Sequence, residues 1–411
     1  MLTGINNIIS ILFMILFSYQ IVYIIVSLFI KEKEERYEFS YHRYGILICA
    51  RNEENVIGSL LQSINRQKYP KDKYRVFVMA DNCTDNTAAI ARNHGTTVYE
   101  RFNNVKVGKG YALEELLKHI DEDHPDECEA FMVFDADNIL KDDYILQMNI
   151  SYCKGNKIVA GYINTKNYDS NWISAGYSLF LLKKNRFLNN ARHLLKTNCA
   201  INGTGFLFDK NVVKDWPYHT LTEDIEFSVD QACRNNRIAY CGRAVLYDEQ
   251  PVSFSQSFNQ RIRWAKGYLQ VMKKYSLKLI RGMANGSFSC FDMLNTLVSA
   301  YSLSMITLLI NVITALALIM SGKDMTSFLQ SMITGLVKAY MCLYISGLLT
   351  TIAEWKNINS TSFNKIMYTF TFPVFIASYL PIAFCAMFKK VTWTPIRHGV
   401  SISSRKLRTY S

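Results

Sequence analysis

The stretch Phe131–Asn138, FMVFDADN, joins an apolar run to two carboxylates that stand one residue apart. Its apolar residues predict a buried strand, and Asp135 and Asp137 then fall at the carboxyl end of that strand, where open α/β sheets bind ligands. Side chains alternate along an extended chain, so both carboxylates could face one divalent cation. Because Asp and Asn are also ordinary turn residues, the stretch alone is compatible with a strand followed by a polar turn.

Strand and helix signals alternate around this stretch, which predicts a mostly parallel α/β sheet. Gly45–Ala50 and Arg75–Ala80 are predicted strands, and polar residues follow each of them, at 51–54 and 81–87. Loops at the carboxyl ends of parallel strands converge, as a nucleotide crevice requires. Asp85 and Thr87 could alternatively only cap the next helix.

A lysine flanked by glycines, Lys109 in the run Gly108–Gly110, opens another predicted helix. The GxxxxGK[ST] pattern of a P-loop is missing, but the ammonium could still meet a phosphate at that helix start.

Two acids, Glu223 and Asp224, open a helix predicted to run to about Asn235, downstream of a tight NGTG turn at Asn202–Gly205. Acids in a first turn stabilise a helix by roughly 0.3–1 kcal/mol each. Alternatively, one of them is a general base that takes a proton from an attacking hydroxyl. Their position alone does not decide between these two interpretations.

Phe258–Gln270 predicts a helix in which Gln260, Arg263 and Trp264 share one face. An amide, a cation and an indole on one stripe could bind a diphosphate and stack on a sugar ring. The alternative is an interfacial helix whose basic residues face anionic lipid. Those residues are Arg261, Arg263, Lys266, Lys273 and Lys274.

The composition predicts a membrane protein of more than one domain, because 411 residues are 49% hydrophobic and 13% aromatic. The net charge of +12 fits nucleic acid, an anionic membrane face or a polyanionic substrate, and the long apolar segments favour the membrane. Ten cysteines without a CxxC pair argue against zinc and for a reducing compartment.

Ile8–Ile30 is an uncharged, largely apolar run that predicts a retained membrane anchor, since a basic n-region and a small-residue cleavage site are missing. Basic residues follow it at 31–36, so the positive-inside rule places the next domain in the cytosol. Further spans are predicted at Val298–Met320, about Phe328–Ala353 and Met367–Phe388. In the second, Lys338 is either a snorkelling side chain or an intramembrane polar site.

The third predicted C-terminal span contains Pro373 and Pro381, which can break its backbone ladder. Three simple spans would leave the basic tail at 389–411 outside, against the charge rule. We therefore expect the proline-broken stretch to be re-entrant or interfacial, returning the tail to the cytosolic side.

Five motifs stand in an order that resembles the membrane-embedded, polymer-forming kind of family 2 glycosyltransferases, the group of poly-β-1,6-N-acetylglucosamine, cellulose and chitin synthases. They are ARNEE at 50–54, ADNCTDNT at 80–87, DAD at 135–137, TED at 222–224 and QRIRW at 260–264. Each motif is weak alone, but the ordered set is specific and covers nearly the whole chain. The resemblance implies an N-terminal transmembrane anchor (1–36), a cytosolic α/β domain of the GT-A type (37–255), amphipathic interface helices (256–292), a transmembrane bundle (293–388) and a basic tail (389–411).

The resemblance also implies a role for each motif. Ala50, Arg51, Glu53 and Asp81 would contact the uridine of a UDP-sugar, with Lys109 near the nucleotide. Asp135 and Asp137 would bind Mg²⁺ or Mn²⁺ at the diphosphate, and Asp224, with Glu223 beside it, would be the catalytic base. Gln260, Arg263 and Trp264 would hold the leaving diphosphate and the acceptor.

The implied activity is inverting, metal-dependent transfer of a sugar, N-acetylglucosamine being favoured, from a UDP-sugar to a growing β-linked polysaccharide that is exported. The implied location is the cell membrane, with several spans and a cytosolic catalytic domain. Expected partners are membrane lipid and a small accessory membrane subunit, and no nucleic acid. Three alternatives stay open: transfer of a single sugar to a lipid-linked acceptor, synthesis of another β-glycan (cellulose-, chitin- or hyaluronan-like), and a non-catalytic membrane scaffold. The tail motif Trp393–His398 has no role that its residues predict.

Overall fold

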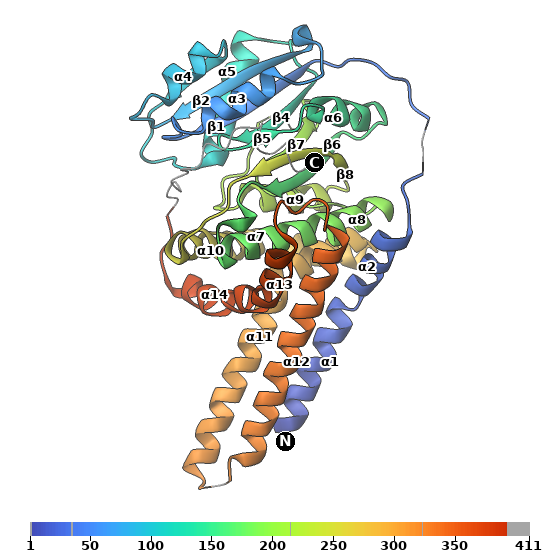
Figure 1. The fold of residues 1–411 in the computed structure, drawn as a ribbon, viewed down its shortest axis with the longest axis vertical. Coiled ribbons are helices and arrows are strands. Elements are labelled where there is room, and N and C mark those ends of the chain that lie inside the picture. Colours follow the sequence, from blue (N-terminus) through green and yellow to red (C-terminus); the bar gives the residue numbers. More distant parts are fainter. Residues whose placement is uncertain (1, 34–35, 214, 323, 393–411) are drawn as a thin grey trace.

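The computed structural model describes residues 2–33, 36–213, 215–322 and 324–392. The chain forms an α/β domain from whose base long helices project (Figure 1). The tail residues Arg397, Arg405, Lys406 and Arg408 and the motif Trp393–His398 lie outside the described residues.

The described part of the domain contains one sheet with the strand order β3-β2-β1-β4-β7-β6-β8-β5. Its strands are β1 (Tyr44–Ala50), β2 (Tyr74–Asp81), β3 (Thr97–Arg101), β4 (Ala130–Asp135), β5 (Ile139–Leu140), β6 (Ile158–Thr165), β7 (Phe206–Asp209) and β8 (Ile238–Asp248). Strand β1 pairs in parallel with β2 and β4, β2 with β3, and β6 with β8, whereas β7 and β5 pair antiparallel with their neighbours. The predicted mostly parallel α/β sheet is therefore confirmed.

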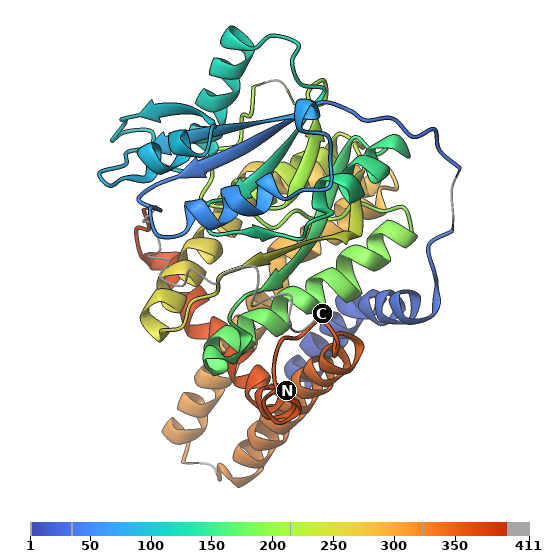
Figure 2. The ribbon, with the colours of Figure 1, turned by 45° about the horizontal axis from the view of Figure 1, so that its top comes forward.

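Helices cover both faces of the sheet (Figure 2). They are α3 (Ile57–Asn65), α4 (Thr87–Asn93), α5 (Lys109–Asp123), α6 (Tyr144–Cys153), α7 (Trp172–Lys183), α8 (Asn190–Leu194) and α9 (Glu223–Cys233). Alternation along β1 divides the core: Ile46 and Ile48 pack in one cluster with Leu60 of α3, and Leu47 packs in the other with Leu116 of α5. Because both faces are buried, the strand is a continuous apolar run rather than an alternating one.

The register of the central strands sets where the functional loops gather. Ala50 lies opposite Ala80, and Cys49 lies opposite Asp135, so β1, β2 and β4 end at the same edge. Strand β4 ends at Asp135, and Asp137 lies in the turn that follows. Strand alternation is therefore not what aligns the two carboxylates, contrary to the argument from the sequence.

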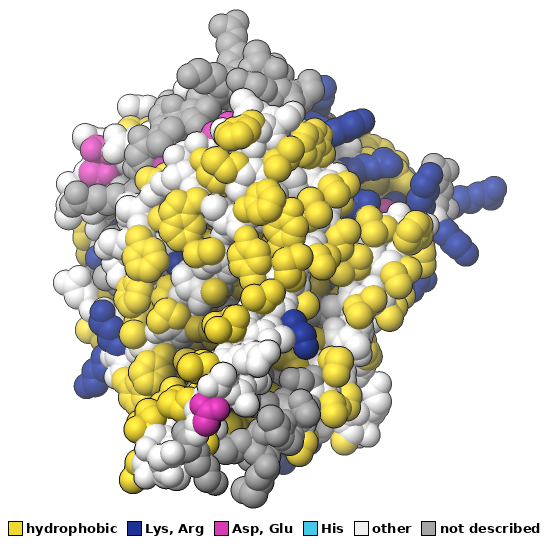
Figure 3. Space-filling view, turned by 60° about the horizontal axis from the view of Figure 1, so that its bottom comes forward, with side chains coloured by type: hydrophobic (Ala, Val, Ile, Leu, Met, Phe, Trp, Pro, Cys, Tyr) yellow, Lys and Arg dark blue, Asp and Glu magenta, His cyan; other side chains and the backbone are white. Residues whose placement is uncertain are grey.

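The remaining helices form the base of the molecule. They are α1 (Leu2–Phe17), α2 (Tyr19–Phe29), α10 (Phe254–Ala284), α11 (Phe288–Met320), α12 (Thr326–Ala353), α13 (Ser362–Ala377) and α14 (Tyr379–Phe388). Among the described residues, the stretches Ile11–Phe29, Thr326–Ala353 and Ser362–Phe388 are long and apolar enough to cross a membrane, and Ser304–Met320 of α11 is a shorter apolar stretch. Hydrophobic side chains cover much of this end of the molecule (Figure 3). Lys338 is exposed on α12 and is not among the residues that line the cavity described below, which favours snorkelling.

The proline-containing stretch folds as two helices that meet at Ser378. Helix α14 lies across the base beneath α10, whereas α1, α11 and α12 project away from it (Figure 1). Arg261 of α10 holds this junction, since its Nη1 donates to Ser378 Oγ at 2.7 Å and to Phe375 O at 3.2 Å. This geometry suits an interfacial segment, and the membrane side of the tail stays a prediction.

The alternative interpretation of α10 as a lipid-facing basic helix is wrong for several of its cations. Arg261 is buried, Lys266 Nζ donates to Ala386 O at 3.1 Å, and Lys274 pairs with Glu226 of α9. Only Lys273, among the cations named for that role, is both exposed and outside the described ion pairs and hydrogen bonds. Helix α10 is held mainly by protein contacts on this side.

A buried ion pair joins the N-terminal helix to the rest of the chain. Arg192 of α8 donates to both carboxylate oxygens of Asp292 on α11, at 2.7 and 2.8 Å. Tyr19 and Tyr23 of α2 donate to the same two oxygens, at 2.9 and 2.7 Å. Removing one partner would leave an uncompensated buried charge, which typically costs about 3–5 kcal/mol.

Candidate active site

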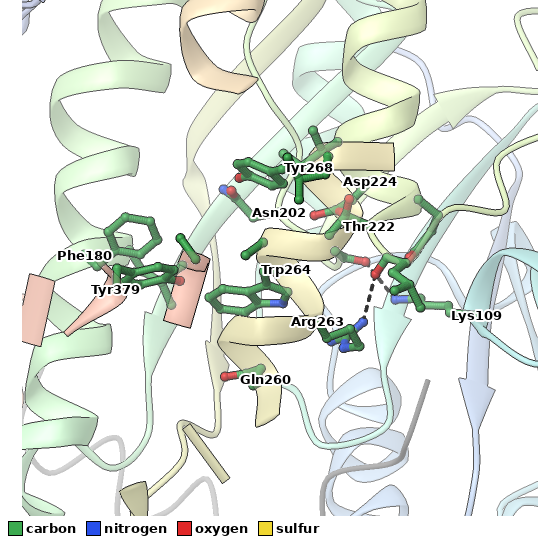
Figure 4. A pocket seen from close by; sticks show the side chains of 18 of the residues that line it. Lys109, Phe180, Asn202, Thr222, Asp224, Gln260, Arg263, Trp264, Tyr268 and Tyr379 are labelled. Atoms are coloured by element: carbon green, nitrogen blue, oxygen red, sulfur yellow. Dashed lines mark hydrogen bonds between the residues drawn. The ribbon is translucent and has the colours of Figure 1, made fainter. Parts of the chain in front are cut away.

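The residues predicted for the site line one cavity of about 1260 Å³ where the sheet edge meets α10. They are Ala50, Arg51, Glu53, Asp81, Lys109, Asp135, Asp137, Glu223, Asp224, Gln260, Arg263 and Trp264. Figure 4 shows Lys109, Asp224, Arg263 and Trp264 around it. The structure thus brings together motifs that are far apart in the sequence.

The loops after β1 and β2 form one wall of the cavity. Asp81 is buried at the end of β2, where its Oδ1 accepts a 2.7 Å hydrogen bond from Nη1 of Arg101, at the end of β3. Thr87 Oγ1 accepts a 2.8 Å hydrogen bond from the backbone N–H of Glu53. Thr87 therefore links the two loops, in addition to beginning helix α4. Arg101 is a residue that the sequence analysis missed.

Lys109 is paired with the first carboxylate of the DAD motif. Its Nζ contacts Asp135 Oδ1 and donates to Gly203 O at 2.7 Å. Asp137 is buried, and its Oδ2 accepts from the Glu249 backbone N–H at 3.0 Å. The Lys109 ammonium therefore lies beside the acidic pair and supplies a positive charge there.

A third carboxylate, Asp248 at the end of β8, lies beside this pair. Burial and the charges of Asp137 and Asp135 raise the pKa of Asp248 well above its usual range. Among the described residues, no group of three or more His, Cys, Asp and Glu side chains is arranged to hold a metal ion by itself. The donor set still fits Mg²⁺ or Mn²⁺, because such sites commonly combine one or two carboxylates with substrate phosphates.

The TED motif and the DAD motif approach each other at Gly203. A Cβ at Gly203 would lie 3.9 Å from Asp224 Oδ2 and 4.0 Å from Asp135 Oδ2, and this glycine has a φ of +76°. Burial, and then the charge of Asp224, raise the pKa of Glu223 to about 7. Burial also raises the pKa of Asp224, against the lowering effect of Lys184 and Arg263. A carboxylate pair with raised pKa values can accept a proton near neutral pH.

Helix α10 packs closely against the TED motif at Gly267. A Cβ at Gly267 would lie only 2.5 Å from Thr222 Oγ1, so a larger residue here would push the helix away. Arg263 Nη1 donates to Leu221 O at 3.1 Å, and the Leu221 N–H donates to Gln270 at 3.0 Å. The QRIRW helix is thereby fixed against the loop that carries the acids.

Several residues of the cavity have a buried polar atom without a hydrogen-bond partner in the described chain. Among these atoms are Oδ1 of Asn202, Oγ1 of Thr222 and Oε1 of Gln260. Buried polar atoms in native proteins are nearly always hydrogen-bonded. Unpartnered atoms that line a cavity therefore mark places where a polar ligand would bind.

Phe180 of α7 and Lys184, directly after α7, are two cavity residues that the sequence analysis missed. Lys184 begins a π-helical segment, Lys184–Asn189, a distortion that is common at functional sites. Burial lowers the pKa of Lys184 to about 8, while Asp224 acts in the opposite direction. No carboxylate of the described chain lies within 4.0 Å of its ammonium, which instead lies 5.5 Å from the Phe180 ring centroid. The sequence signal was only a lysine pair at the end of an apolar helix.

The cavity continues past Trp264 into an apolar half that the sequence analysis did not predict. Trp264, Phe180 and Tyr379 line the cavity, and Phe180 lies next to Tyr379, with their ring centroids 6.4 Å apart (Figure 4). Residues of α10, α11 and α14 line this half, among them Met272, Ile306, Leu309, Val312, Phe384 and Met387.

A mostly parallel sheet whose strand ends hold paired acids beside a second acid pair and a basic helix face fits an enzyme that transfers sugars. Residues 42–267 match the sequence profile described as "Glycosyltransferase like family 2", and the chain belongs to this family.

Two curated relatives and one solved structure are similar to the chain. It is 27% identical over 258 residues to a poly-beta-1,6-N-acetyl-D-glucosamine synthase of Staphylococcus epidermidis, covering 60% of this chain and 58% of the relative. It is 24% identical over 270 residues to a beta-monoglucosyldiacylglycerol synthase of Nostoc sp., covering 63% and 56%. The match thus spans little more than half the length of these relatives.

The fold is similar to that of a mannosyltransferase from Pyrobaculum calidifontis in complex with GDP-Man and Mn²⁺. The TM-score is 0.60 at 16% identity, over 94% of this chain and 99% of the other. This confirms the GT-A-like fold.

Proposed function

We propose that this protein is an inverting, divalent-cation-dependent glycosyltransferase that uses a UDP-sugar, with N-acetylglucosamine as the favoured sugar. The observation that carries the proposal is the single cavity that collects the acidic pair, the buried acids of α9 and the cationic face of α10. The catalytic domain faces the cytosol, where nucleotide sugars are made.

The donor lies along the sheet edge. Ala50, Arg51, Glu53 and Asp81 contact the uridine, and Arg101 fixes Asp81 through its 2.7 Å hydrogen bond. Asp135 and Asp137 hold the cation, which when bound neutralises charge on the leaving diphosphate. Lys109 leaves Asp135 for a phosphate oxygen as the nucleotide binds.

The acids of α9 activate the acceptor. Asp224 takes the proton of an acceptor hydroxyl, and the oxygen attacks the anomeric carbon as its bond to the diphosphate breaks. Glu223 shares the proton with Asp224, and Arg263 stabilises charge on the leaving group. A single displacement inverts the anomeric centre, so an α-linked donor gives a β-linked product.

The first acceptor candidate is a growing β-linked polysaccharide, exported through the membrane with the help of a small accessory subunit. The name of the Staphylococcus epidermidis relative supports it. The second candidate is a lipid-linked acceptor that receives a single sugar. The apolar half of the cavity favours this second candidate, as does the name of the Nostoc relative.

The test is UDP release by the purified chain from a panel of nucleotide sugars, with Mn²⁺ or Mg²⁺ and with EDTA. We expect release from one UDP-sugar, its loss in EDTA and its return with the cation. Asp137→Ala is expected to abolish release, and full turnover by this variant would refute the proposal. Mass spectrometry of the products separates single additions from polymer.

A further inference from the structure

The apolar half of the cavity has a composition unlike that of a path for a sugar polymer. Its lining is dominated by aliphatic and thioether side chains, such as Met272, Leu309, Val312 and Met387, from three helices. Sugar hydroxyls would find few hydrogen-bond partners there, and burying them unpaired is costly. An alkyl chain, in contrast, gains free energy on leaving water.

This apolar half is continuous with the site of the acids. The same cavity is lined by Asp224, by Trp264 and Tyr379, and by the aliphatic side chains of α11 and α14. Leu309 and Phe384 line it and are nevertheless 60% and 56% exposed, so the groove is open between these two helices. An occupant can therefore place one end beside Asp224 and the other among membrane-facing side chains.

The junction between the two halves carries polar groups suited to a head group. Asn202 has a buried Oδ1 without a hydrogen-bond partner in the described chain, and Lys184 has no ion-pair partner there. Both line the same cavity as Asp224, and Asn202 directly precedes Gly203, whose Cβ would lie 3.9 Å from Asp224 Oδ2. A polar head followed by an apolar tail would satisfy both halves.

We propose that the acceptor is a lipid whose head-group hydroxyl lies at Asp224 and whose apolar tail lies in the groove between α10, α11 and α14. This inference rests on the proposed sugar transfer and names the class of its acceptor. The hydroxyl loses its proton to Asp224, its oxygen bonds to the anomeric carbon, and UDP leaves with the electrons of the broken bond.

The test uses two acceptors with the same head, methyl and octyl β-N-acetylglucosaminide, and the full chain in lipid nanodiscs. The donor is the UDP-sugar found active in the panel. We expect kcat/KM for the octyl acceptor to exceed that for the methyl acceptor at least tenfold, since each buried methylene group contributes about fourfold. Equal values would overturn the inference.

Partitioning of the octyl chain into the nanodisc is separated from groove binding by two variants. Ala383→Trp fills the groove, because Ala383 lines it on α14, whereas Val374→Trp adds the same bulk to an exposed position of α13 outside the cavity. We expect Ala383→Trp to lose the octyl preference and Val374→Trp to keep it. A preference that survives in Ala383→Trp would refute the groove as the tail site, while UDP titration checks that both variants are folded.

The inference and the proposed function fail in different ways. Rapid polymer formation without any added lipid acceptor, or transfer that ignores the tail, refutes the lipid acceptor and leaves sugar transfer intact. Absence of both UDP binding and UDP release refutes sugar transfer itself.

Discussion

The contact between Gly267 and Thr222 provides a sharp test of how α10 is placed, through the substitution Gly267→Ala. The added Cβ would lie 2.5 Å from Thr222 Oγ1 and 2.6 Å from Cγ2. Carbon contacts are optimal at about 3.5–4.0 Å, so helix and loop must separate by roughly 1 Å. Overpacking of this kind costs about 1–3 kcal/mol, which a gain of about 1 kcal/mol in helix propensity only partly offsets.

We expect Gly267→Ala to affect catalysis, measured as kcat, more strongly than it affects the stability of the fold. Arg263 reaches Leu221 O from the same helix, so a shift of α10 moves the cation relative to the acids. A misplacement of about 1 Å can cost about 100-fold in rate, and we expect a loss of that order in kcat. UDP release under saturating donor measures it, and the midpoint of thermal unfolding measures the accompanying destabilisation.

Two further variants make this prediction refutable. Gly335→Ala is the matched control, because a Cβ at Gly335 of α12 has nothing within 4 Å and activity should be unchanged. Thr222→Ala removes the two closest atoms, and its Oγ1 has no hydrogen-bond partner to lose in the described chain. The double variant Gly267→Ala/Thr222→Ala should therefore be more active than Gly267→Ala. Parental activity of Gly267→Ala, or no rescue in the double variant, would refute the reasoning.

Four other predictions concern the charged groups of the cavity. Asp224→Asn should lower kcat about 10²–10⁴-fold while UDP binding, measured by titration, persists. The rate should fall as the pH drops through about 7, because the Glu223–Asp224 pair then takes up a proton. Lys184 lowers the pKa of Asp224, so Lys184→Met should raise it and move the acidic limb of kcat/KM to higher pH. Lys109→Ala removes the ammonium from Asp135, so Mn²⁺ should bind the nucleotide-free protein more tightly, as measured by electron paramagnetic resonance.

Conservative variants control these predictions. Lys184→Arg keeps the charge and should retain the parental pH profile, and an unshifted profile in Lys184→Met would show that this cation does not act on Asp224. Lys109→Arg should keep the parental Mn²⁺ affinity. Unchanged affinity in Lys109→Ala would mean that the ammonium does not compete for Asp135.

The sheet and the polar ends of its strands were predictable because both depend on local sequence. Buried parallel strands are continuous apolar runs, as in β1 and β4, and the residues after them must lie at the carboxyl edge. The helix that begins at Glu223 was predictable in the same way, whereas the catalytic role of its acids was implied only by the resemblance. These features need no knowledge of distant contacts.

The partners of the site residues were not predictable, because they come from elements distant in the chain. Arg101 reaches Asp81 across 20 residues, and Arg261 reaches Ser378 across 117. Arg261 and Lys266 were assigned to anionic lipid in one interpretation of the sequence, yet they donate hydrogen bonds to α13 and α14. The sequence of an amphipathic helix does not distinguish a basic residue that contacts lipid from one that donates a hydrogen bond to a backbone carbonyl.

The apolar half of the cavity could not be predicted from the sequence, for a related reason. Leu309 and Phe384 are ordinary residues of apolar helices, and only the packing of α11 beside α14 and α10 makes them part of the cavity. Their hydrophobicity predicted membrane contact and carried no information on which of them would meet a substrate.

The buried pair of Arg192 and Asp292 has a consequence for biosynthesis. Tyr23 leaves the ribosome 269 residues before the Asp292 carboxylate to which it donates. At about 5–20 residues per second, the N-terminal helix waits about 13–54 s for that partner. Helix α2 can therefore dock against Asp292 only after the whole sheet domain has been synthesised. An unrelated apolar helix in its place would leave Asp292 without its two tyrosines.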